Sequence, residues 1–109
     1  MQIAMPTPVA LYFQSEAFDD TGHIADFFTP DAAVIDERRT HQGHDAIRAW
    51  KAESKAATRY TVTPVSAEPD GARVLVLGRV EGDFPGSPVM LRYQFDLQGD
   101  RISRLEIRA

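Results

Sequence analysis

Apolar residues recur at helical spacing in two segments near the start of the chain. In residues 8–19 the apolar positions on one face are Val9, Tyr12, Phe13 and Ala17. This i, i+3, i+4, i+8 spacing predicts an amphipathic helix, and Pro8 suits its first turn because the missing N–H is not needed there. The second segment carries Ile24, Phe27 and Phe28. We expect a brief helix here, because Pro30 prevents it from continuing far.

The next segment is predicted to pair two short strands and then return to a helix. Residues 32–36 and 41–42 are the expected strands, joined by a charged turn at residues 37–40. From residue 44 to residue 57 the helical spacing returns, and the residues on its one face are Ala46, Ile47, Trp50 and Ser54. Asp45 lies in the first turn, where a negative charge is favourable. Arg48 and Lys51 fall on other faces of this helix.

Beyond Arg59 the apolar period becomes two, as in β-strands. The pattern predicts strands at residues 60–64, 73–81, 89–97 and 102–108, with turns or loops at 69–71, 82–88 and 98–100. The strand at 73–81 is apolar on both faces, with Val74 and Val76 opposite Leu75 and Leu77. We expect the helices to cover one face and a partner to cover the other.

This order of elements predicts an α+β fold. The N-terminal helices pack on one face of a strongly curved antiparallel sheet, and together they form a cone-shaped α+β barrel that encloses a pocket. A length of 109 residues allows one core, so we expect a single domain over residues 1–109. Hydrophobic residues make up 43% and charged residues 26%, which is typical of a globular protein and not of a disordered chain.

Charge and composition limit the classes of binding partner and the cellular location that we expect. The net charge is −4 and there is no block of like charges, which argues against nucleic acid or an anionic membrane as partner. The absence of cysteine excludes disulfides and thiolate chemistry. The first residues, MQIAMPTP, do not resemble a signal peptide, and no apolar stretch is long enough for a membrane helix. We therefore expect a cytoplasmic protein.

Three strings, in this order and spacing, resemble the nuclear transport factor 2-like superfamily, especially its SnoaL-like and ketosteroid isomerase-like branches. They are IADFFTPDAAVID (24–36), GHDAIRAW (43–50) and YQFDLQGDRISRLEI (93–107). The resemblance covers almost the whole chain and implies a homodimer whose cone binds a small apolar molecule, with no cofactor. It is less specific for activity, because the superfamily includes isomerases, cyclases, epoxide hydrolases, dehydratases and proteins without catalysis.

The resemblance to the isomerase branch implies two catalytic residues. The branch has a tyrosine on its first helix and a general-base aspartate at the end of its first strand, and these positions hold Tyr12 and Asp36. A carboxylate in such a place moves a proton on a carbon acid, and a phenol donates a hydrogen bond to the enolate oxygen. Ketosteroid isomerase also uses a protonated aspartate. Leu91 stands at that position, so half of the oxyanion hole is missing.

The remaining candidates have structural alternatives. The residues expected to line the pocket are Phe28, Trp50, His41, Leu91 and Tyr93. Asp36 could instead be an ordinary solvated charge, and Tyr12 and Trp50 could be core residues. His41 and His44 have the spacing of no known ligand set, so we expect no metal. Two functions therefore stay open: an isomerase- or cyclase-type acid–base enzyme on an apolar carbonyl compound, or a non-catalytic ligand-binding or dimerisation module.

Overall fold

The computed structural model describes residues 4–16, 23–57 and 59–109. The elements follow one another as α1 (Thr7–Glu16), α2 (Ile24–Phe27), β1 (Phe28–Asp36), β2 (Arg39–Gln42), α3 (His44–Ala57), β3 (Tyr60–Asp70), β4 (Arg73–Gly82), β5 (Val89–Gln98) and β6 (Arg101–Arg108). The expected order of helices and strands is therefore confirmed. The expected end of the first helix, with Ala17, lies outside the described residues.

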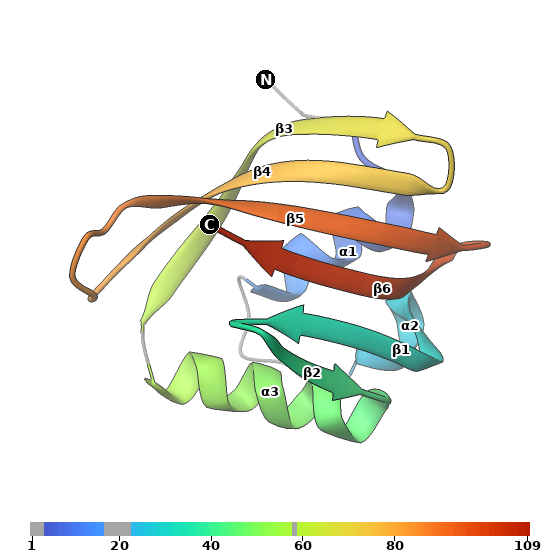
Figure 1. Ribbon diagram of the computed structural model, residues 1–109, viewed down its shortest axis with the longest axis horizontal. Coiled ribbons are helices and arrows are strands. Elements are labelled where there is room, and N and C mark those ends of the chain that lie inside the picture. The colour runs from blue at the N-terminus through green and yellow to red at the C-terminus, as the bar shows by residue number, and fades with distance from the viewer. Residues whose placement is uncertain (1–3, 17–22, 58) are drawn as a thin grey trace.

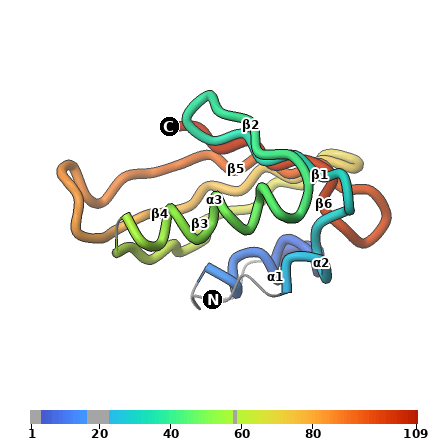
Figure 2. The backbone as a smooth tube through the Cα atoms, turned by 90° about the horizontal axis from the view of Figure 1, so that it is seen from below, coloured from blue at the N-terminus to red at the C-terminus, as the bar shows by residue number. Residues whose placement is uncertain are grey.

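The strands form one curved, open sheet in the order β2-β1-β6-β5-β4-β3 (Figure 1). Four of the five pairings are antiparallel, as expected, and β1 pairs with β6 in parallel. The parallel pair makes the sheet mixed within the expected α+β class. It arises because α3 and four strands, β2 to β5, separate β1 from β6 in the chain, so no hairpin constrains their direction. Figure 2 shows α1 and α2 together on one side of the sheet.

Prolines lie within two of the strands, and each occurs where the sheet tolerates a missing N–H. β1 begins at Phe28, earlier than expected, and Pro30 falls where the pairing of β1 with β6 is irregular, between Phe28 and Ala33. β3 continues to Asp70 through Pro64 and Pro69. It is an edge strand, and its register shifts next to Pro64. Edges and bulges are the positions in which strands accept proline.

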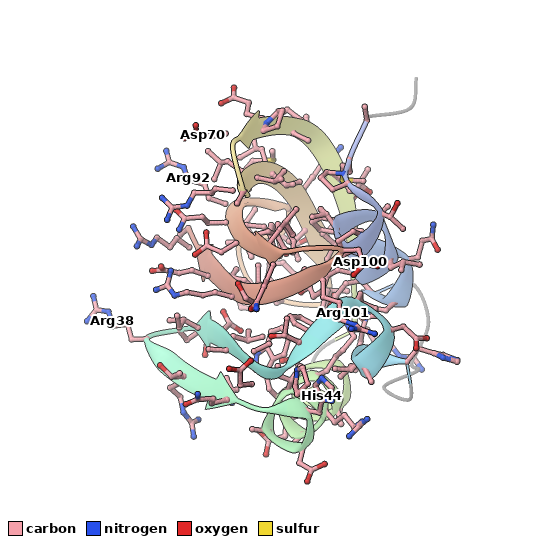
Figure 3. All side chains as sticks on the ribbon, turned by 90° about the vertical axis from the view of Figure 1, so that its right-hand side faces the viewer. Arg38, His44, Asp70, Arg92, Asp100 and Arg101 are labelled. Atoms are coloured by element: carbon pink, nitrogen blue, oxygen red, sulfur yellow. The ribbon has the colours of Figure 1, made fainter. Side chains whose placement is uncertain are left out.

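The two faces of the sheet differ in their environment. Side chains that face the helices form the core, which includes Val9 and Phe13 of α1 and Val74, Val76 and Phe95 of the sheet. On the opposite face Leu75 and Met90 are 39% and 43% exposed, and Figure 3 shows Arg92 pointing away from the N-terminal helices. No helix among the described residues is long and apolar enough to cross a membrane.

Candidate functional site

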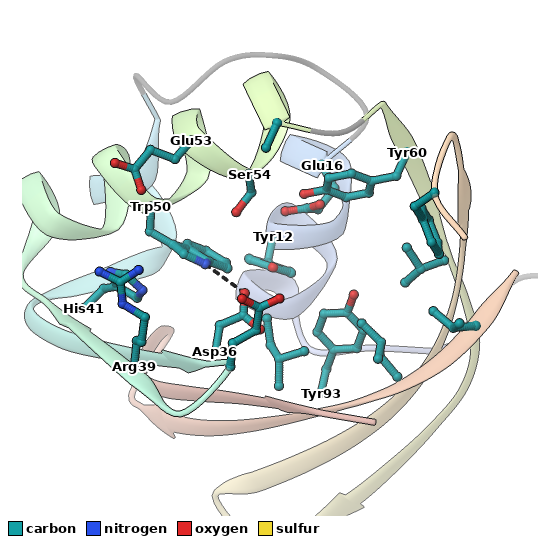
Figure 4. A pocket seen from close by; sticks show the side chains of 17 residues that line it. Tyr12, Glu16, Asp36, Arg39, His41, Trp50, Glu53, Ser54, Tyr60 and Tyr93 are labelled. Carbon is teal, nitrogen blue, oxygen red and sulfur yellow. Dashed lines mark hydrogen bonds between the residues drawn. The ribbon is translucent and has the colours of Figure 1, made fainter. Parts of the chain in front are cut away.

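A pocket of about 550 Å³ lies between α1, α3 and the concave face of the sheet (Figure 4). Six of the seven residues expected in the site line it, and they are Tyr12, Asp36, His41, Trp50, Leu91 and Tyr93. They come from α1, β1, β2, α3 and β5, so the fold brings together residues that are up to 81 positions apart in the sequence. A cavity of this size is in the usual range for small-molecule sites.

Phe28 is the expected lining residue that the structure does not place in the pocket. Its side chain is 0% exposed, and its ring packs in the core against those of Tyr12 and Phe27, with centroids 6.2 and 5.2 Å away. Phe28 begins β1 and Asp36 ends it, so the two lie roughly 25 Å apart at the usual rise of a strand. The pocket is at the Asp36 end.

Asp36 is half-buried at the end of β1 and faces the pocket (Figure 4). The indole Nε1–H of Trp50 donates a hydrogen bond to its Oδ2 over 3.0 Å. Within the described part of the chain, no lysine, arginine or histidine nitrogen lies within the 4.0 Å of an ion pair with Asp36. The carboxylate is therefore held in place by a neutral donor and keeps its second oxygen for a ligand.

The mouth of the pocket is formed by the β1–β2 hairpin and α3. Arg39 is the register partner of Asp36 in this hairpin, and it lines the pocket together with Glu53. The ring of His41 lies beside that of Trp50, with a centroid distance of 6.0 Å and an interplanar angle of 33°. His41 thus packs beside the indole that donates to the Asp36 carboxylate.

The inner end of the pocket contains a buried ion pair that the helical pattern did not predict. Lys51, which we expected on an outer face of its helix, is 2% exposed, and Glu16 is 5% exposed. Nζ of Lys51 lies 2.5 Å from Oε1 of Glu16. Lys55 donates to the main-chain oxygen of Glu16 and approaches its Oε2 to 3.9 Å. Burial lowers the pKa of Lys51, because the loss of solvent outweighs the attraction of the carboxylate.

Glu16 itself lines the pocket, and its spacing from Tyr12 in the sequence could have indicated this. It follows Tyr12 by four residues, which places both on the same face of α1. A carboxylate on the apolar face of a helix requires a partner, and a lysine on a neighbouring helix is the most direct one. The sequence alone does not reveal that α1 and α3 approach each other at this point.

All three tyrosines of the sequence line this one pocket. Burial raises the pKa of Tyr12, Tyr60 and Tyr93, and the negative charge of Glu16 raises each of them further. The ammonium groups of Lys51 and Lys55 lie over the rings of Tyr12 and Tyr60, at 4.8 and 4.4 Å from the centroids. The three phenols are consequently neutral at physiological pH and act as hydrogen-bond donors.

The remaining wall is apolar. It is formed by Val80, Val89, Leu91 and Ile107 of the sheet and by Phe84 of the β4–β5 loop. Leu91 lies in this wall and supplies no second acid there. The pocket thus combines an apolar side with carboxylates and phenols, which can bind an apolar compound and transfer a proton to or from it.

His44 lies outside the pocket. Its Nε2 is 3.0 Å from the main-chain oxygen of Phe28, so it connects the start of α3 to the start of β1. The described residues contain no group of three or more histidine, aspartate or glutamate side chains that could hold a metal ion.

Comparisons with known proteins agree with this fold. The family model of the SnoaL-like domain matches residues 9–105. A polyketide cyclase candidate from Sinorhizobium meliloti is 42% identical, with a TM-score of 0.91 and 95% of each chain covered. A protein of ketosteroid isomerase-like fold from Catenulispora acidiphila, in complex with trimethylamine, is 19% identical, with a TM-score of 0.85 over 97% of this chain and 87% of that one.

The epoxide hydrolase/cyclase-like enzyme SalBIII, from pyran ring formation in salinomycin, is 21% identical, with a TM-score of 0.78 over 93% of this chain and 86% of that one. No curated protein matches the sequence. The family model spans nearly the whole chain, and the structural neighbours share its helices and curved sheet. The chain therefore belongs to the SnoaL-like domain family, within the nuclear transport factor 2-like superfamily.

Proposed function

We propose that the protein is an acid–base enzyme of the isomerase or cyclase type that acts on a small, mostly apolar carbonyl compound. Asp36 is its general acid/base, and a tyrosine of the pocket donates a hydrogen bond to the carbonyl oxygen. The apolar wall receives the body of the substrate. The similarity to a polyketide cyclase candidate, at 42% identity, supports a carbonyl substrate, because such cyclisation proceeds through an enolate.

The observation that carries this proposal is the environment of the Asp36 carboxylate. Its carboxylate faces an aromatic pocket, is oriented by the indole of Trp50, and forms no ion pair with any described residue. A structural aspartate would normally be solvated or paired with a cation. An oriented, unpaired carboxylate beside a cavity is instead the arrangement required of a base that must reach a carbon-bound proton.

The proposed reaction moves one proton from carbon to Asp36 and back to carbon. Asp36 takes a proton from the carbon next to the carbonyl group, and the electron pair of that bond moves onto the carbonyl oxygen to give an enolate. A phenol stabilises the enolate oxygen by a hydrogen bond. Protonated Asp36 then returns the proton to carbon, either at the same atom or at a conjugated one. The resemblance singles out Tyr12 as the phenol, and Tyr93 is a second candidate in the same pocket.

Proton exchange in heavy water tests this proposal without knowledge of the natural substrate. The probe is 2-tetralone, whose protons next to the carbonyl group are acidic and whose exchange for deuterium is followed by proton NMR. We expect the wild-type protein to accelerate exchange, and Asp36→Asn to lower the protein-catalysed rate about 100-fold or more. The matched control is Asp100→Asn, at an exposed turn, which should retain the wild-type rate. Undiminished exchange in Asp36→Asn would contradict the proposed base.

A second candidate is ligand binding without reaction. Leu91 supports it, because the pocket wall offers no second acid there to complete an oxyanion hole. Trimethylamine in the protein of similar fold from Catenulispora acidiphila illustrates a small ligand that an unpaired carboxylate and aromatic rings would attract. Saturable binding of 2-tetralone or trimethylamine with no catalysed exchange would favour this candidate over the enzyme.

We also propose that two copies of the chain associate through the outer face of the sheet. Leu75, Leu77 and Met90 lie there, opposite the helices, among charged residues such as Arg79 and Arg92. A second copy would cover these apolar side chains, which a monomer leaves in water.

A further inference from the structure

We propose that Glu16 is a second ligand-binding group of the pocket and that it accepts a hydrogen bond from a neutral donor on the ligand. The substrate class is accordingly a hydroxylated carbonyl compound, with its carbonyl group toward Asp36 and a hydroxyl group toward Glu16. This inference rests on the proposed function, because it narrows the substrate of the same pocket.

Glu16 and Asp36 reach the pocket from different elements. Glu16 is the last residue of α1 and Asp36 the last residue of β1, and both line the cavity. Figure 4 shows the Glu16 carboxylate next to Tyr60, whereas the Asp36 carboxylate lies beside the indole of Trp50. A ligand that extends from Asp36 toward the inner end of the pocket therefore meets a second carboxylate there.

The Glu16 carboxylate retains capacity to accept a hydrogen bond. Lys51 donates to its Oε1 over 2.5 Å. Lys55 donates to the main-chain oxygen of Glu16, and its Nζ is 3.9 Å from Oε2, which is longer than a hydrogen bond. A carboxylate offers about four acceptor positions on its two oxygens. Since the side chain is 5% exposed and lines the cavity, a ligand in the pocket can reach the remaining positions.

The charges around Glu16 favour a neutral donor over an ion. The described residues that line the pocket include neither Lys51 nor Lys55, so a ligand meets the carboxylate and not the ammonium groups. An anionic group on the ligand would be repelled by this carboxylate. An ammonium group would be a third cation beside one negative charge. A hydroxyl group donates a hydrogen bond without either penalty.

Stability alone gives no reason for a carboxylate at this place. Glu16 and Lys51 are 5% and 2% exposed, and a buried ion pair is often no more stabilising than apolar side chains of similar volume. The pair does keep an ionised acceptor in a position that faces the cavity. Lys51 supplies the positive charge from the side of Glu16 that a ligand does not need.

A matched pair of probes tests the inference in the wild-type protein. The probes are 6-hydroxy-2-tetralone, whose hydroxyl group lies at the far end of the ring system from the carbonyl group, and its methyl ether, which has no donor there. The indole N–H signal of Trp50, the single tryptophan, reports binding by NMR. We expect the hydroxyl compound to bind about 10-fold more tightly or better, as is typical of a hydrogen bond to a charged group.

Variants then locate the group that recognises the hydroxyl. The double variant Glu16→Met with Lys51→Met replaces the buried pair by apolar side chains of similar length, so it should remain folded, and we expect it to lose the preference. Glu16→Gln keeps a neutral acceptor and should retain a preference of only about 2- to 3-fold. Glu53→Gln is the matched control, because Glu53 is an exposed carboxylate that also lines the pocket, and it should bind as the wild type does.

The outcomes distinguish this inference from the proposed function. Equal binding of the two probes by the wild type, or binding of neither, overturns the inference, while catalysed exchange of 2-tetralone still upholds the enzyme. A preference that survives in the double variant, or is lost in Glu53→Gln instead, also overturns it. A preference that depends on Glu16 without catalysed exchange upholds the hydroxyl site for a binding protein, and the enzyme proposal fails.

Discussion

Removing the buried ammonium group of Lys51 should destabilise the protein more than any change of a surface charge. In Lys51→Met a side chain of similar length fills the space, but Glu16, 5% exposed, loses the cation 2.5 Å from its Oε1. Breaking a buried pair on one side costs roughly 3–5 kcal/mol. Lys55 remains 3.9 Å from Oε2 and compensates in part. We therefore expect a loss of about 3 kcal/mol in the free energy of unfolding, or about 12 °C in Tm.

The assay is urea unfolding followed by the fluorescence of Trp50, with thermal unfolding by circular dichroism as a second probe. Arg48→Met is the matched control, because Arg48 lies on the same helix in an exposed pair with Asp45 and should change stability by less than about 0.5 kcal/mol. The double variant Lys51→Met with Glu16→Gln should recover much of the loss, since no unpaired charge then stays buried. A loss below about 1 kcal/mol in Lys51→Met would show instead that Glu16 reaches solvent and does not depend on the Lys51 ammonium group.

Two further predictions concern the tyrosines and the outer face of the sheet. Alkaline titration should show no tyrosinate absorbance in the folded protein near pH 10, because the pKa of Tyr12, Tyr60 and Tyr93 is raised in the fold. The unfolded chain loses these protons at about pH 10, so the free energy of unfolding should fall as the pH rises above that value. The lowered pKa of Lys51 makes the free energy of unfolding rise with pH, but this is one group against three tyrosines. A tyrosine that loses its proton near pH 10 before the protein unfolds would contradict the burial of these side chains. Light scattering at micromolar concentration should give the mass of a dimer, and Leu75→Glu should give that of a monomer; a wild-type monomer would remove the dimer proposal.

The fold could be predicted from the sequence because the spacing of apolar residues in each segment is typical of either a helix or a strand. The helical spacing of Val9, Tyr12 and Phe13 and the alternation of Tyr93 and Phe95 in β5 both correspond to side chains that the structure buries. The order of elements then leaves few arrangements of helices on a curved sheet. The spacing of apolar residues does not determine whether two distant strands pair in parallel or antiparallel. The parallel pairing of β1 with β6 was not predicted for that reason.

The candidate site could be predicted in part. Tyr12, Asp36 and Trp50 came from the resemblance and from helical spacing, and the structure brings them to one pocket. Glu16 and Lys51 were missed because a lysine near the edge of an apolar helical face is usually solvated, and only the contact between α1 and α3 shows that this one is buried.

A crystal structure of the protein with 2-tetralone would show directly whether the pocket presents a carbonyl compound to Asp36. We expect the ring system to lie against the apolar wall, the carbonyl oxygen within hydrogen-bonding distance of a tyrosine hydroxyl of the pocket, and the adjacent carbon against the second oxygen of Asp36. The indole of Trp50 should still donate to the other carboxylate oxygen. A ligand bound outside this pocket, or an Asp36 side chain turned to solvent when the pocket is occupied, would contradict the proposed function.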